Sequence, residues 1–235
     1  MNLPKGFVSG SIAAGLKSSG ALDLTIIQNC GPNKFGTAVF TSNKVVAAPV
    51  IWSRQVIKDR EVSAVVLNSG GANACTGSEG FTDTHLTAEL VGAKLGVSSG
   101  EVVVCSTGLI GERLPMEKIK KGIAAIQLDK SGFQDSAKAI MTTDSVPKMA
   151  TLNRYGVTIS GIAKGAGMLA PTLATMLSVV MTDAEVDIEE ADGAFDRAVE
   201  VSYNRIDSDG CTSTNDTVLF MASGASGIKL NREQL

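Results

Sequence analysis

Short apolar runs alternate along the chain with glycine-rich segments and with stretches of helical spacing. Seven runs are rich in β-branched residues and predict strands, at Leu22–Ile27, Thr37–Thr41, Val62–Leu67, Glu101–Cys105, Val157–Ile162, Met176–Met181 and Thr217–Ala222. Val102–Cys105 and Met176–Met181 are apolar nearly throughout, so we expect both to be buried on the two faces of a sheet.

Helical periodicity marks four segments between those runs, at Thr84–Leu95, Pro115–Ile126, Phe133–Met141 and Ile188–Val201. Gly96 is suited to end the first helix, and Pro115 is suited to begin the second. Near the end of the chain, Asn231 with Gln234 three residues later is typical of a helix N-terminus. We therefore expect an α/β fold with helix and sheet layers, and we interpret the chain as a piece of a longer protein.

The composition is that of a globular protein, because 44% of the 235 residues are hydrophobic and the mean hydropathy is +0.17. The net charge of −3 offers no basic field for nucleic acid or for an anionic membrane, so we expect neither partner. No apolar stretch is long enough to span a bilayer, and the first residues lack the apolar core of a signal peptide. These features predict a cytoplasmic protein.

The cysteines and the one histidine exclude several kinds of site. Cys30, Cys75, Cys105 and Cys211 form no C-x-x-C pair, so no metal site is expected and we interpret them as buried, reduced thiols. A Ser-His-Asp or Cys-His scheme would have to use His85.

The segment from Lys164 to Ala184 carries the densest candidate chemistry. Its glycines and Pro171 predict a loop, and Thr175 stands directly before the apolar run Met176–Met181. Attack of the Thr175 hydroxyl on the Ala174 carbonyl would cut the chain and expose an α-amine at Thr175. Such an amine, with an ordinary pKa of about 7.7–8.0, can serve as the base for a threonine nucleophile. The alternative is that Thr175 merely begins a strand.

Two other segments suggest binding chemistry. Gly165–Ala170 matches a dinucleotide fingerprint, but Pro171 denies it the helix that such a fingerprint requires. Thr107 and Gly108 follow a buried strand and could be placed to stabilise an oxyanion, although the pattern by itself favours a plain glycine turn.

Three polar segments have simpler interpretations. We interpret Asn68–Gly77 as a structured loop near a site, because it lacks the Lys-Ser/Thr of a phosphate-binding loop. Asp207–Gly210 lacks the spacing of a calcium loop and predicts a turn. Thr142 lies at a helix end, from which its hydroxyl could reach a ligand.

Five segments together resemble the ornithine acetyltransferase (glutamate N-acetyltransferase) family of arginine biosynthesis. They are NSGGANACTG at Asn68–Gly77, CSTGLIGERLP at Cys105–Pro115, MTTDSVPK at Met141–Lys148, KGAGMLAPTLATML at Lys164–Leu177 and DGCTSTNDT at Asp209–Thr217. The likeness follows the same order through essentially the whole chain, and the Lys164–Leu177 segment is highly specific.

The resemblance implies a self-cleaving acetyltransferase. Cleavage would fall between Ala174 and Thr175, and Thr175 would then carry the acetyl group from N-acetylornithine to glutamate. The family pattern implies that Thr107 and Gly108 stabilise the oxyanion, and that Thr142, Lys164 and Thr175 contact the substrate. Some members also accept acetyl-CoA as a donor, and no cofactor is implied.

The resemblance also implies an organisation in two chains. Residues 1–174 would form an α chain, and residues 175–235 would begin a β chain whose later portion is not in this sequence. The pair would assemble as α2β2, with the stacked layers of N-terminal-nucleophile hydrolases and a family-specific connectivity. Two alternatives stay open: a related self-processing threonine aminopeptidase or amidase, and a non-catalytic module that binds an anion or a nucleotide through the glycine-rich loops.

Overall fold

The computed structural model describes residues 2–168, 176–231 and 234. Nine strands lie within these ranges: β1 (Phe7–Ile12), β2 (Leu24–Asn29), β3 (Phe35–Phe40), β4 (Ala64–Asn68), β5 (Val102–Ser106), β6 (Lys148–Arg154), β7 (Val157–Lys164), β8 (Leu177–Thr182) and β9 (Thr217–Ala222). The helices of the same ranges are α1 (Ala48–Val56), α2 (Gly77–Leu95), α3 (Met116–Ala125), α4 (Phe133–Ala139) and α5 (Ile188–Val201), with three short 3₁₀ turns.

The strands form two mixed sheets. One has the order β1-β2-β4-β5, and the other has the order β3-β9-β8-β7-β6. Within them β4 runs parallel to β5 and β8 runs parallel to β9, whereas the other neighbouring strands are antiparallel. The chain therefore has the α/β character that the sequence predicts.

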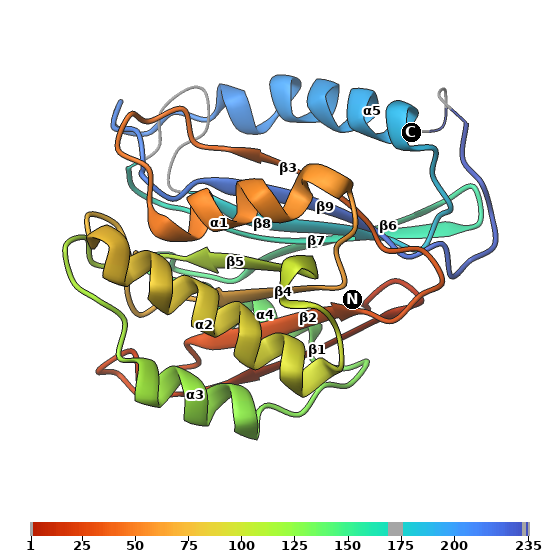
Figure 1. Ribbon diagram of the computed structural model, residues 1–235. Coiled ribbons are helices and arrows are strands. Elements are labelled where there is room, and N and C mark those ends of the chain that lie inside the picture. Colours follow the sequence, from red (N-terminus) through yellow and green to blue (C-terminus); the bar gives the residue numbers. More distant parts are fainter. Residues whose placement is uncertain (1, 169–175, 232–233, 235) are drawn as a thin grey trace.

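The two sheets face each other, and helices cover their outer faces (Figure 1). The main core lies between the sheets and combines residues such as Leu67 and Val103 of one sheet with Val179 and Leu219 of the other. A second core joins the outer face of the four-stranded sheet to α2 and α3, and a third joins α5 to the five-stranded sheet. The result is a layered arrangement of helix, sheet, sheet and helix.

The predicted strands are all present, with bounds shifted by a few residues at most. Val102–Cys105 is buried throughout as predicted, and Met176–Met181 is buried except at Val180, which is half-buried. The four predicted helices are also present, but α2 begins at Gly77, seven residues before the predicted start at Thr84. Gly96 ends that helix in the left-handed conformation that favours glycine.

The turn predicted at Asp207–Gly210 is confirmed, whereas the helix predicted to begin at Asn231 falls largely on residues outside the described ones. In that segment Asn231 and Gln234 exchange two hydrogen bonds of 3.1 Å between backbone N–H groups and side-chain oxygens, as in a capping box, and Gln234 lies in a turn. The N–H of Gly210 donates to Asp207 in a turn. The cysteines were expected to be buried, but only Cys105 is, because the other three lie in exposed loops.

Among the described residues, no cluster of three or more histidine, cysteine or acidic side chains has the arrangement of a metal site. No helix in the same part of the chain has the length and apolar character needed to cross a membrane.

Candidate active site

The site is built around Lys164, the last residue of β7. Its side chain is fully buried, and its Nζ donates to the hydroxyl of Thr142 at 3.5 Å. Burial lowers the pKa of Lys164 to about 8, although the carboxylates of Asp144 and Asp216 act to raise it. Two residues that are 22 positions apart in sequence, and that the resemblance assigns to substrate binding, are thus in contact.

Asp144 holds the Thr142 segment against the end of β7. Its carboxylate accepts the N–H of Gly165 at 2.8 Å and that of Thr142 at 3.2 Å, and it forms an ion pair with Lys148. Burial acts to raise the pKa of Asp144, but the Lys148 ammonium and the two backbone donors outweigh burial and lower it. Asp144 therefore stays ionised and neutralises part of the positive charge beside Lys164.

The predicted oxyanion residues follow β5. Thr107 is buried, its N–H donates to Asn68 O at 3.0 Å, and it forms an isolated bridge with Gly71. Gly108 adopts φ +136°, where a Cβ would lie 2.7 Å from the nitrogen of Gly71. This position therefore requires glycine, because any side chain would force the two loops apart.

Asn215, in the loop before β9, fastens this region from the other sheet. Its Nδ2 donates to Ala72 O at 2.6 Å, in the Asn68–Gly77 loop, and to Ser106 O at 2.9 Å, at the start of the loop of residues 107–115 (the Thr107 loop). One amide therefore holds both loops. The loops also bind each other directly, because the N–H of Ala72 donates to Leu109 O at 2.9 Å. The Asn68–Gly77 loop is therefore ordered by contacts with the Thr107 loop, as expected of a structured loop near a site.

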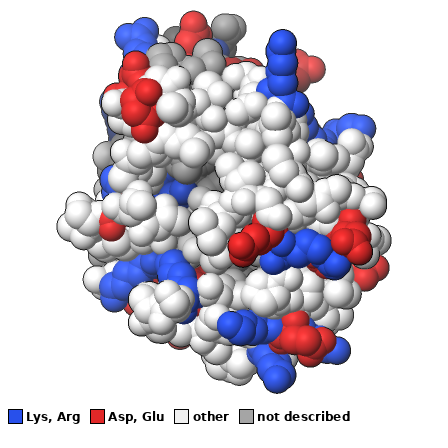
Figure 2. All heavy atoms as spheres, turned by 90° about the vertical axis from the view of Figure 1, so that its left-hand side faces the viewer, with Lys and Arg blue, Asp and Glu red and all other residues white. Residues whose placement is uncertain are grey.

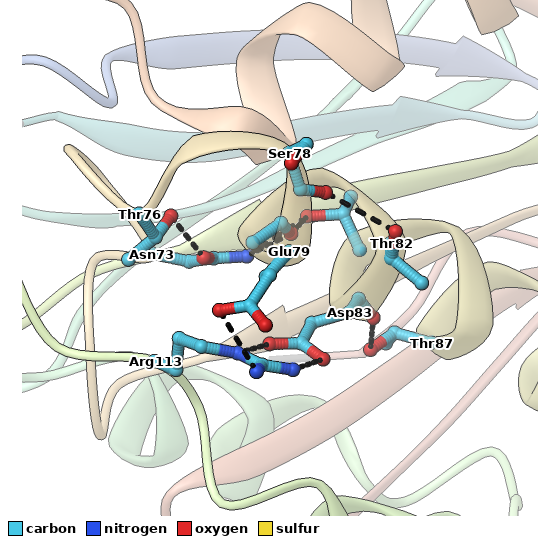
Figure 3. Close-up of polar contacts among 10 residues, drawn as sticks. Asn73, Thr76, Ser78, Glu79, Thr82, Asp83, Thr87 and Arg113 are labelled. Carbon is cyan, nitrogen blue, oxygen red and sulfur yellow. Dashed lines mark hydrogen bonds and ion pairs between the residues drawn. The ribbon is translucent and has the colours of Figure 1, made fainter.

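Arg113 fastens the far end of the Thr107 loop to α2 (Figure 3). Its guanidinium donates two hydrogen bonds of 2.8 Å to the carboxylate of Asp83, which is nearly buried, and it forms a 3.2 Å ion pair with exposed Glu79. The Asp83 carboxylate raises the pKa of Arg113 above its usual range. This bidentate contact between the guanidinium and the carboxylate fixes the orientation of the loop as well as its position.

Asp216 is the residue next to Asn215 and is fully buried. Its Oδ1 accepts the N–H of Met176 at 2.8 Å, and its backbone oxygen accepts the N–H of Thr41 at 3.0 Å. Burial raises the pKa of Asp216 to about 6, while the Met176 N–H acts to lower it. Asn215 and Asp216 could not be identified as site residues from the residues alone, because an Asn-Asp pair before a strand resembles an ordinary turn.

The predicted cleavage residues Ala174 and Thr175 lie outside the described residues, as does part of the Gly165–Ala170 segment. Met176, directly after Thr175, is described and is held by Asp216. The end of β5, the start of α2 and the end of β7 lie toward the left side of Figure 1. Figure 2 shows that this side of the molecule is hollowed, with Lys or Arg atoms at the floor of the hollow.

Comparison with known proteins decides the family. The ArgJ family profile matches residues 8–235 of the chain. The chain belongs to the ArgJ family. Two relatives are both named arginine biosynthesis bifunctional protein ArgJ: the Streptomyces coelicolor protein is 57% identical over 95% of this chain, and the Thermobifida fusca protein is 54% identical over 95%. This ArgJ-family chain spans 59% of the length of each of them.

Solved ArgJ structures share the fold. The ornithine acetyltransferase of Mycobacterium tuberculosis, solved in complex with ornithine, matches with a TM-score of 0.69 and 49% identity over 74% of this chain and 94% of that chain. The ArgJ protein of Bacillus halodurans matches with a TM-score of 0.62 and 29% identity over 75% of this chain and 97% of that chain. The mixed α/β architecture is therefore that of the ArgJ family.

Proposed function

We propose that the full-length protein transfers the acetyl group of N-acetylornithine to glutamate in arginine biosynthesis, after cutting itself between Ala174 and Thr175. The observation that carries this proposal is the contact between buried Lys164 and Thr142, near a strand that begins two residues after Thr175. Membership of the ArgJ family supports the reaction class, and the ornithine in the Mycobacterium tuberculosis structure supports the substrate class.

Each residue would have one chemical role. The Lys164 ammonium would attract the carboxylate of an amino-acid substrate, with the Thr142 hydroxyl beside it. The liberated α-amine of Thr175 would take the proton of its hydroxyl while that hydroxyl attacks the acetyl carbon. Thr107 and Gly108 would stabilise the oxyanion. An acetyl-threonine ester splits one difficult transfer into two easier ones.

We also propose that the mature protein consists of two chains, residues 1–174 and a chain beginning at Thr175, in an α2β2 assembly in the cytoplasm. Each solved relative is matched over nearly its whole length by three quarters of this chain, whereas the curated relatives are much longer than this chain. Such short chains are what internal cleavage would produce. The layers of helix, sheet, sheet and helix support the proposed likeness to N-terminal-nucleophile hydrolases.

The donor and the acceptor can be separated by assay. Because the relatives are named bifunctional, we propose acetyl-CoA as a second acetyl donor. A self-processing amidase would use the same Thr175 but would give the acetyl group to water. Full-length protein incubated with N-acetylornithine and glutamate should form N-acetylglutamate, and release of free acetate instead would assign the amidase activity.

The cleavage is tested by Thr175→Ala in the full-length protein. This variant should remain one uncut chain without transfer activity, because it lacks the attacking hydroxyl, and intact mass should show one species. The matched control Thr172→Ala removes a hydroxyl three residues earlier and should be cut like the wild type. If Thr175→Ala is still cut at the same bond, another group is the nucleophile and the proposed mechanism is wrong.

A further inference from the structure

The loop between β1 and β2, residues 13–23 (the Lys17 loop), lies at the end of the four-stranded sheet that carries the candidate site. Leu24, the residue after this loop, pairs with Asn68 at the end of β4, and Asn68 pairs with Ser106 at the end of β5. The two site loops begin at those strand ends. The Lys17 loop is therefore their neighbour in space, although it precedes both of them in the sequence.

A buried carboxylate gives the Lys17 loop a fixed shape. Asp23 is fully buried, and its carboxylate accepts the N–H groups of Ala14 at 2.7 Å, Leu16 at 2.6 Å and Lys17 at 3.0 Å. The loop also packs closely against the Asn68–Gly77 loop, because a Cβ at Gly70 would lie 2.2 Å from the Cβ of Leu16. Three hydrogen bonds to one carboxylate hold the backbone here, so the Lys17 side chain leaves the loop from a defined point.

The side chain of Lys17 lines a cleft that Thr142 also lines. The cleft has a volume of about 300 Å³ and lies between the Lys17 loop and the segment after α4, with Lys138 as a second cation in its lining. Lys17 Nζ donates to Leu22 O at 2.9 Å, whereas Lys138 forms a 3.0 Å ion pair with Asp135. In residues 2–168, 176–231 and 234, no carboxylate forms an ion pair with Lys17.

The charge of Lys17 belongs to the same electrostatic environment as that of Lys164. Burial lowers the pKa of half-buried Lys17, whereas the carboxylates of Asp23 and Asp144 act to raise it. Asp144 is also the carboxylate that acts most strongly on Lys164, and Lys17 itself acts to lower the pKa of Lys164. Lys17 is thus a second cation of the candidate site, and its ammonium has no carboxylate in direct contact.

The two proposed substrates differ in the cations that they need. N-acetylornithine has one carboxylate and a side-chain amine that is protonated at neutral pH, whereas glutamate has two carboxylates separated by three carbon atoms. In the proposed function, Lys164 and Thr142 bind the carboxylate that both substrates share. The second carboxylate of glutamate needs a further cation nearby, and Thr142 connects the two places because it contacts Lys164 and lines the Lys17 cleft.

We propose that Lys17 is a specificity-determining residue, which binds the side-chain carboxylate of the acceptor glutamate in this cleft; this inference rests on the proposed function. An ammonium has three N–H donors, so Lys17 can bind a carboxylate oxygen while it keeps its hydrogen bond to Leu22 O. The protonated side chain of N-acetylornithine gains nothing from this cation and lies elsewhere. Lys17 therefore selects the acceptor and is not needed for the donor.

The test is Lys17→Met in the full-length protein, with Lys118→Met as the matched control. Lys118, on α3, donates to Gly15 O at 2.6 Å, so the control loses a contact with the same loop while the cleft keeps its cations. In Lys17→Met the KM for glutamate should rise about 30-fold with little change in kcat, because only acceptor binding is weakened. Exchange of labelled ornithine into N-acetylornithine without glutamate, which reports the donor half-reaction, should stay within about twofold of the wild type. Lys118→Met should match the wild type in both assays.

Glutamine as an alternative acceptor separates carboxylate binding from a structural role. It has the shape of glutamate without the charge, so the wild type should strongly prefer glutamate and Lys17→Met should lose most of that preference. Lys17→Arg keeps a cation and should retain part of it.

Three results would overturn the inference. An unchanged preference for glutamate over glutamine in Lys17→Met would show that its ammonium does not bind the side-chain carboxylate. An equal loss of ornithine exchange in this variant would make Lys17 a residue that only shapes the loop. A defect confined to acetyl-CoA as the donor would assign the cleft to the phosphates of that donor. If the wild type forms no N-acetylglutamate and exchanges no ornithine, the proposed function fails instead.

Discussion

Lys164 is a buried cation in an apolar sheet, and its position is costly. Folding removes its ammonium from water, and the nearby carboxylates of Asp144 and Asp216 compensate only in part, which is why its pKa falls from 10.5 to about 8. Below about pH 8 the folded protein must hold the disfavoured charge, and the cost disappears as the pH rises toward 10.5, where the unfolded chain also loses the proton. A fold would not keep this residue for stability alone.

Replacing Lys164 with methionine should therefore raise stability and abolish function. At pH 7 we expect Lys164→Met to be more stable by about 1–3 kcal/mol, a gain that shrinks between pH 8 and 10.5. Transfer should fall at least about 100-fold, because the substrate carboxylate loses its cation. Denaturant unfolding and steady-state kinetics measure both effects. Lys120→Met, on the exposed side of α3, is the control, and unchanged kinetics in Lys164→Met would remove Lys164 from the site.

In the wild type, transfer should decline on the alkaline side near pH 8, where Lys164 loses its proton. The decline should appear in kcat/KM, because the charge acts in the free enzyme. A profile that stays flat to pH 10 would show that the Lys164 charge is not used.

Among the elements, the loop after β5 depends on its anchor to α2. Arg113→Lys replaces the two parallel hydrogen bonds to Asp83 with a single point charge, so the Thr107 loop gains freedom. We expect transfer to fall about tenfold with little change in stability, because Arg113 is half exposed and the ion pair is screened. Glu79→Gln, which loses only the exposed partner of Arg113, should behave as wild type in the same assay, and equal kinetics in all three proteins would contradict this role.

Most elements could be predicted from the sequence, but three could not, for physical reasons. β1 carries serine and glycine among its apolar residues, and β6 is an exposed edge strand, so neither has a clear alternation of apolar residues. α1 begins with proline and is too short to establish a period. The spacing of apolar residues reflects which side of an element is buried. A short or half-exposed element has too few buried positions to show such a spacing.

The site shows the same limit. Lys164 and Thr142 are brought together by the β6–β7 hairpin, in which Lys148 pairs with Ala163, and no local pattern specifies that register. Asp216 becomes visible only once β8 and β9 are known to be parallel neighbours. Candidate residues could therefore be named by resemblance, but their partners required the fold.

For the whole molecule, the sheet order has a consequence if the protein is cut as we propose. The strand order β3-β9-β8-β7-β6 places the two strands that follow residue 175 between strands that precede it. After cleavage, hydrogen bonds between β3 and β9 and between β7 and β8 would join one chain to the other. Separation of the chains would require opening a sheet in its middle, so the pieces should stay together.

The position of β8 and β9 between earlier strands also changes how the protein refolds after denaturation. An uncut polypeptide forms this sheet by intramolecular folding. Two cleaved chains must first meet by diffusion, so the rate of their refolding becomes second order in protein concentration. After dilution from guanidinium, recovery of far-ultraviolet circular dichroism should slow in proportion to dilution for the mature enzyme and proceed at one fixed rate for Thr175→Ala. A concentration-independent rate for both would argue against severed halves. Maturation would thus be a one-way step, which leaves a protein that holds its shape well but reassembles poorly.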